Sequence, residues 1–240
     1  MSESFQNSPH ASAILWKAVD SQDPAGSSVT LQNTMFFGDS AAIHFATTPS
    51  EVQISNCLKL GGGTMLTFAS PPKAGRELQL ALKQLTLRGS AALLAMPVPE
   101  KPAKSGRTSI ETVDCVFDLA EPQTSLFLFR SRFHSSGWLK QIKMTSKGSL
   151  AKPGLLIAQW THPETGKRAA IESTRIEVRG SPVSIGTYEF TDPGFSMNPA
   201  DSVLKSWRVP RTSPNPPGID ASQLRFIQNS RFPLKKDRAE

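Results

Sequence analysis

The sequence predicts an all-β fold, mainly an antiparallel β-sandwich of the jelly-roll type, with one or two short helices and flexible termini. Short runs of β-branched and apolar residues are separated by turn residues roughly every eight to twelve positions. The 19 prolines and 16 glycines among the 240 residues supply much of this punctuation. We find no internal repeat and no heptad.

Composition divides the chain into three segments. Residues 1–28 are rich in Ser, Gln, Asn and Pro and predict a flexible lead-in, with a short amphipathic turn around 13–19. Residues 29–195 predict the β-rich core domain. Residues 196–240 predict a short helix over 199–207, followed by a basic, Pro-rich tail that is partly disordered.

The first half of the core predicts four clear strands and one ambiguous segment. Residues 75–88 fit either an amphipathic helix or two strand segments with a slip between Leu82 and Leu85. We favour strands, because Gln79, Thr86 and Arg88 then face outward together. The four clear strands are Val29–Phe37, Ala42–Ala46, Glu51–Leu60 and Thr64–Phe68.

The second half begins with an exposed proline-rich loop over 97–106, whose prolines exclude a central strand. A hairpin connection is predicted over Thr161–Lys167. The strands predicted here are Ser109–Leu119, Ser125–Phe133, Trp138–Thr145, Leu155–Thr161, Ala169–Val178 and Pro182–Phe190.

Several functional classes are disfavoured by composition. Cys57 and Cys115 are far apart and predict buried, unpaired thiols, and the four scattered histidines predict no metal site. We expect no cofactor. The longest apolar runs are much shorter than the ~20 residues of a transmembrane helix, and residues 1–10 lack a secretory signal pattern. We therefore expect an intracellular protein that is not secreted.

One short motif resembles an enzyme family. Phe36-Phe37-Gly38-Asp39-Ser40 is similar to the first block of the Gly-Asp-Ser hydrolases, in which the serine is the nucleophile. A serine nucleophile needs a histidine base held by a carboxylate, and no histidine here follows an Asp at that family's spacing. We expect a turn at this motif and at Gly61–Gly63, and no enzyme.

The most informative segment is residues 122–163, which contains no acidic residue although the chain carries 20. Cations that neutralise phosphates release counterions, and aromatic rings stack on unpaired bases. The segment therefore predicts binding of single-stranded RNA without sequence choice, with Trp138 as an exposed stacking residue. The predicted contacts are Arg130, Arg132, Lys140, Lys143, Lys147 and Lys152, supplemented from the tail by Arg231, Lys235, Lys236 and Arg238.

The order of segments resembles the thirty-kilodalton superfamily of plant-virus movement proteins. The resemblance lies in the apolar run 78–97, the strand 110–118 with Asp114 or Asp118 near its end, and the later strands to Val178. It implies a β-rich core related to the jelly roll, cooperative RNA binding, cell-to-cell movement of a viral genome, and a location in the host cytoplasm or at plasmodesmata. Self-association is a further expectation.

Three alternatives remain open. A jelly-roll coat protein shares this composition, but its basic arm is usually N-terminal, whereas residues 1–72 here carry two basic and five acidic residues. Another RNA-virus binding protein, of the matrix or silencing-suppressor kind, is the second alternative. A cellular interaction domain is the remaining possibility.

Overall fold

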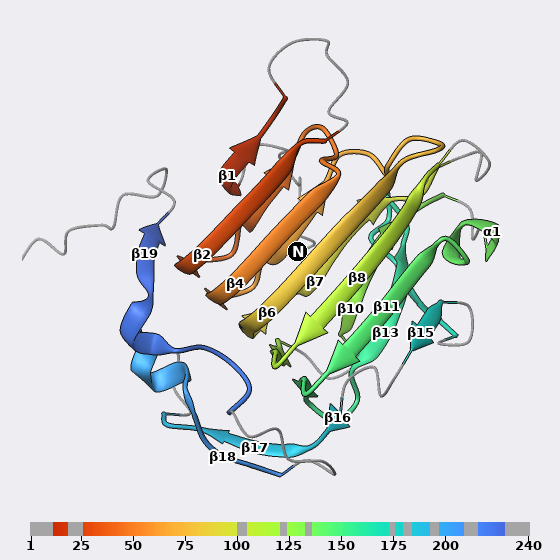
Figure 1. Cartoon of the computed structure of the whole chain (residues 1–240). Coiled ribbons are helices and arrows are strands. Elements are labelled where there is room, and N and C mark those ends of the chain that lie inside the picture. The colour runs from red at the N-terminus through yellow and green to blue at the C-terminus, as the bar shows by residue number, and fades with distance from the viewer. Residues whose placement is uncertain are drawn as a thin grey trace, which may run out of the picture.

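The chain winds as a parallel β-helix, which is called the coil below, and successive strands alternate between sheets (Figure 1). The computed structural model describes residues 12–18, 26–99, 105–120, 124–132, 136–172, 176–179, 184–192, 197–208 and 216–228. Even-numbered strands β2 to β8 lie side by side at the front of Figure 1, and strands such as β7 and β10 lie behind them.

Two large sheets and one two-stranded sheet contain all the described strands. The seven-stranded sheet runs β1 (Ser12–Trp16), β3 (Ala41–Phe45), β5 (Thr64–Phe68), β7 (Ala92–Pro97), β10 (Ser125–Arg130), β13 (Leu156–Thr161) and β14 (Arg168–Ile171). The ten-stranded sheet runs β15 (Glu177–Arg179), β11 (Ile142–Lys147), β8 (Arg107–Val113), β6 (Glu77–Ser90), β4 (Glu51–Leu60), β2 (Ser28–Phe37) and β19 (Arg225–Gln228).

The remaining elements are short. Strands β9 (Val116–Leu119), β12 (Leu150–Ala151) and β16 (Ser184–Ile185) extend the ten-stranded sheet around a corner, beside the second half of β6. Strands β17 (Thr187–Phe190) and β18 (Leu204–Arg208) form the two-stranded sheet. The helical turns are α1 (Ser136–Leu139), η3 (Pro199–Ser202) and η4 (Ala221–Gln223). No helix in the described part of the chain has the length and apolarity needed to cross a membrane.

The predicted antiparallel jelly-roll sandwich is wrong. Almost every described strand pair is parallel, and the exceptions between strands are β13–β14 and β17–β18. The β content was readable because inward and outward side chains alternate along a strand. Alternation is the same in both kinds of sheet, however, and turn residues do not reveal which strand lies alongside which.

The number of residues differs from one turn of the coil to the next, which explains why no repeat is visible in the sequence. Val52 pairs with Leu80, Leu80 with Ile110 and Ile110 with Met144, which are separations of 28, 30 and 34 residues. The strands keep their register while the connecting loops vary in length. A search for a fixed period therefore misses a repeated structural unit.

The core lies between the two large sheets. From Glu77 to Lys83 in β6, every second residue is exposed and the leucines between them are buried. Side chains at paired positions stack along the coil, so the rings of Phe45 and Phe68 face each other with centroids 4.6 Å apart. Each fully buried side chain of this size contributes about 1.5–3 kcal/mol to stability. A core built from many such side chains is stable without disulfide bonds.

In successive turns of the coil, the strand path changes direction at one residue that has left-handed backbone geometry, and this residue is called the corner. The φ angles are 52° at Asn33, 48° at Asn56, 51° at Gln84, 51° at Asp114 and 66° at Gly148. Short polar side chains and glycine adopt this conformation most readily. The slip predicted between Leu82 and Leu85 is this corner at Gln84, which confirms the strand interpretation of 75–88. Gln79 is exposed as expected, but Thr86 and Arg88, which were expected to be exposed beside it, are buried.

The later predicted elements were less accurate. The strand predicted over 109–119 is interrupted at the Asp114 corner, and the one predicted over 169–178 is split between β14 and β15. Residues 138 and 139 belong to α1 rather than to a strand. The helix predicted over 199–207 is only η3, followed by β18. In the predicted lead-in, β1 pairs with β3.

The described residues 187–192, 197–208 and 216–228 form a C-terminal strap, which covers the outer face of the coil beyond the corner. Met35 and Leu58 on that face pack with Ile219 of the strap. Val116 and Leu150 pack with Leu204. The predicted basic tail thus begins as part of the folded structure, while its last cations lie outside the described residues.

Candidate functional site

A groove of about 680 Å³ lies where the strands of the ten-stranded sheet begin. It is formed by the loops that carry the chain from the seven-stranded sheet into β6, β8 and β11. Its lining residues are Gly75, Arg76, Glu77, Ser105, Gly106, Arg107, Lys140, Gln141, Lys143 and Glu177.

Backbone hydrogen bonds tie these loops to one another. The amide of Gly106 donates to Pro72 O at 2.7 Å, and the amide of Arg107 donates to Arg76 O at 2.9 Å. A Cβ at position 106 would lie 2.0 Å from Arg76 O, so only glycine permits this approach. The amide of Thr108 donates to Gln141 O at 3.0 Å, which fastens the next loop. These hydrogen bonds between stacked loops therefore fix the shape of the groove.

Four cations and two carboxylates line the groove, giving a net charge of +2 among its side chains. The Lys143 ammonium pairs with Glu177 at 2.9 Å, and the Ser109 hydroxyl donates to Glu77 at 2.5 Å. Arg107 and Lys140 are exposed and form no ion pair with another described residue. Positive charge in the groove is thus available to a ligand.

Lys140 is held in place by the helical turn that precedes it. Trp138 in α1 is completely buried and meets the Phe129 ring edge to face, with centroids 5.0 Å apart and planes at 86°. The prediction that Trp138 is exposed for stacking is wrong. Turn residues before a tryptophan suggested exposure, but an indole buries more apolar area than any other side chain and anchors the loop instead.

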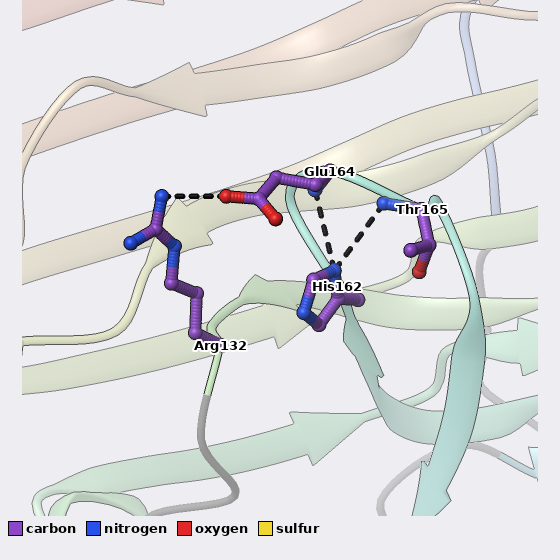
Figure 2. A network of polar contacts seen from close by, with 4 residues as sticks. All are labelled: Arg132, His162, Glu164 and Thr165. Carbon is purple, nitrogen blue, oxygen red and sulfur yellow. Dashed lines mark hydrogen bonds and ion pairs between the residues drawn. The ribbon is translucent and has the colours of Figure 1, made fainter.

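Arg132 belongs to a second polar network at the same edge of the coil (Figure 2). Its guanidinium pairs with Glu164 at 2.6 Å, and both side chains are more than 60% exposed. His162 Nδ1 accepts the amides of Glu164 and Thr165 at 3.3 and 3.2 Å. The hairpin predicted over Thr161–Lys167 is confirmed, and Arg132 ties it to the loop after β10.

The other predicted contact residues lie elsewhere. Lys147 is exposed at the far end of β11, four residues from Lys143. Lys152 pairs with Asp118 at 3.0 Å on the face that the strap covers. Arg130 is half-buried at the end of β10, and burial lowers the pKa of its guanidinium. Arg231, Lys235, Lys236 and Arg238 lie outside the described residues.

The acid-free segment therefore does not form one continuous face. Of its six cations, the structure brings Lys140 and Lys143 together in the groove and disperses the other four. Sequence reasoning missed Arg76 and Arg107, which precede or begin β6 and β8. They become neighbours of Lys140 only through strand register, which no local pattern reveals.

The remaining sequence predictions concern buried thiols and turns. Cys57 and Cys115 are buried and unpaired as predicted, and burial raises the pKa of each thiol, to about 11 and about 12. The Gly38-Asp39-Ser40 motif and Gly61–Gly63 form stacked turns, with the Gly62 amide donating to Asp39 at 2.8 Å. The described residues contain no group of His, Cys, Asp and Glu that could hold a metal ion.

Comparison with known families, curated proteins and solved structures finds no match for this chain.

Proposed function

We propose that this chain is a non-catalytic binding protein that holds single-stranded RNA along the groove without sequence choice. The observation that carries the proposal is the pair of exposed cations on adjacent coils, Arg107 and Lys140, which have no ion-pair partner among the described residues. Two such charges beside each other repel unless an anion lies between them.

The geometry of the coil suits an extended polyanion. Neighbouring parallel strands lie about 4.8 Å apart, so loops at the same edge present their side chains at regular intervals along the coil. Arg76, Arg107 and Lys143 stand on three successive steps of this edge. A single-stranded phosphate backbone lying along the edge would meet one cation after another.

Affinity without sequence choice follows from the kind of side chain present. Lysine and arginine ends on exposed loops reach phosphate oxygens, which are identical for every base. Most of the binding free energy then comes from the release of counterions. We infer affinity that depends strongly on salt and weakly on sequence.

The wider biological role stays a prediction. The resemblance to plant-virus movement proteins was one of layout around an antiparallel core, and the parallel coil does not share that core. The coat-protein alternative also relied on a jelly roll. Cell-to-cell movement, a host-cell location and self-association therefore have no support from the fold, and RNA binding is proposed on the groove alone.

Fluorescence anisotropy with a labelled, unstructured RNA strand tests the proposal. Between about 50 and 200 mM salt, log K should fall against log salt with a slope of about −2 to −3, as expected for three or four neutralised phosphates. Two strands of different sequence should give the same slope. Absence of binding at the lower salt concentration would refute the proposal.

A further inference from the structure

We propose that a second hollow beside the groove receives the base of a nucleotide whose phosphate lies in the groove. This inference rests on the proposed function and extends it from a charged backbone to a nucleotide unit. The two hollows adjoin, because Gly75, Arg76 and Glu77 line both.

The second hollow has a volume of about 250 Å³ and lies between the loops 46–50 and 69–76. These loops precede β4 and β6, so the hollow is one step further along the same edge of the coil. It is smaller than the usual pocket for a drug-sized molecule and suits a single ring system.

Hydroxyl groups on the wall of this hollow are already engaged within the protein. The Thr48 hydroxyl donates to Ser70 O at 2.6 Å, and the Ser50 hydroxyl donates to Ser27 O at 2.7 Å. Thr47 Oγ1 accepts the amide of Ala18 at 3.0 Å. What these residues present to a ligand is therefore largely carbon.

Three prolines complete the apolar wall. Pro49 and Pro72 are buried within their loops and Pro71 is half-buried, so their rings are held rigidly at the hollow. Proline loses little conformational entropy when a ligand binds, because its ring is already fixed. A flat heterocycle placed here removes apolar surface on both partners from water.

An apolar hollow joined to a cationic groove selects a ligand with both characters. In a nucleotide, a flat base and a phosphate are separated by one sugar, and Arg76 stands at the junction of the two hollows. A strand of RNA and a free nucleotide share this chemistry. The proposal is a nucleotide site, and its test distinguishes the two sources.

The test compares three ligands at one salt concentration: an RNA strand, the same strand with abasic sugars, and adenosine monophosphate. Ser70→Leu fills the hollow from an exposed position, and Gln32→Leu is the matched control on an exposed strand position away from both hollows. We expect abasic sugars and Ser70→Leu each to weaken binding of RNA about tenfold, the scale of one base contact, and Gln32→Leu to have no effect.

The outcomes separate the two proposals. If RNA binds with strong salt dependence but neither abasic sugars nor Ser70→Leu weakens it, the nucleotide site is refuted and polyanion binding stands. If RNA fails to bind while the monophosphate binds and Ser70→Leu blocks it, the nucleotide site stands and the polymer proposal is refuted. If neither ligand binds, both are refuted.

Discussion

The side-chain amide of Asn56 donates a hydrogen bond to the side-chain oxygen of Asn33, 2.8 Å away, at the corners of two adjacent coils. Both residues have left-handed backbone geometry. Asn56 also accepts the amide of Asp220 at 2.6 Å and donates to its carbonyl at 3.0 Å. One side chain therefore joins two coils to the C-terminal strap.

Asn56→Ala should destabilise the protein by about 2–4 kcal/mol. Alanine disfavours the left-handed region by about 1–2 kcal/mol, and removal of the amide leaves buried groups without partners. Denaturant unfolding measures the loss. Asn56→Gly keeps the backbone conformation accessible, so it should cost less than Asn56→Ala. An equal cost for the two variants would show that the corner geometry contributes nothing.

This corner shows how far the sequence could predict the fold. The leucines of β6 change phase between Leu82 and Leu85, and that slip is a local signal of a bend. Asn33, Asn56 and Asp114 occupy equivalent corners, but unequal loops separate them, so the sequence does not reveal that they align. Strand positions are encoded locally, whereas parallel pairing depends on contacts about 30 residues apart.

Lys59 should make stability depend on pH in mildly alkaline solution. Its side chain is buried, and its ammonium donates to the carbonyls of Gly38, Leu60 and Gly61. Burial lowers the pKa of Lys59 from its usual 10.5 to about 8. Above pH 8 the folded chain therefore holds fewer protons than the unfolded chain, so the free energy of unfolding rises with pH.

The full effect of Lys59 amounts to roughly 3 kcal/mol between the folded and unfolded pKa values. The raised pKa values of Cys57 and Cys115 act in the opposite sense from about pH 8 upward, because the thiols of the unfolded chain, with their ordinary pKa of 9.0, ionise first. Urea unfolding of the wild type and of Lys59→Met at pH 8 and pH 9 isolates the lysine as the difference between the two proteins, because the thiols act equally in both. The free energy of unfolding of the wild type relative to Lys59→Met should rise across this interval; an unchanged difference would assign the pH dependence to other groups.

Trp138→Ala should cost about 3–5 kcal/mol, the usual loss for a buried aromatic side chain. Trp138→Phe should cost much less, because the indole Nε1 is buried with no hydrogen-bond partner among the described residues. Thermal unfolding of the two variants gives the comparison. A stacking role without burial predicts the contrary, with little effect of either variant on stability.

Arg88 should hold the C-terminal strap in place. Its guanidinium donates to Asp201 O at 3.0 Å and to the Ser202 hydroxyl at 3.2 Å, and it lies 4.1 Å from the centre of the Phe190 ring. Arg88→Met should expose the strap, so that trypsin cleaves faster after Lys205 and Arg208. Lys83→Met, at an exposed position, is the control. Unchanged cleavage in Arg88→Met would mean that apolar packing alone holds the strap.

The site was predictable only in part. The acid-free stretch drew attention to Lys140 and Lys143, which the structure places together in the groove, because charge composition is visible without a fold. Their partners in the groove, Arg76 and Arg107, lie outside that stretch and arrive through strand register. Trp138 was misread because burial depends on what packs above a turn, which composition does not specify.

The most direct test of the central claim compares two double variants that remove the same charge from the same sheet. Arg107→Gln with Lys140→Gln removes the unpaired cations of the groove. Lys83→Gln with Lys147→Gln removes exposed cations of the same sheet that lie away from the groove, Lys83 beside the corner of β6 and Lys147 at the end of β11. In anisotropy titrations with single-stranded RNA, the groove variant should lower the salt slope by about 1.4, and the control should leave it unchanged. Equal losses in both variants would contradict the account, because binding would then follow net charge and not the groove.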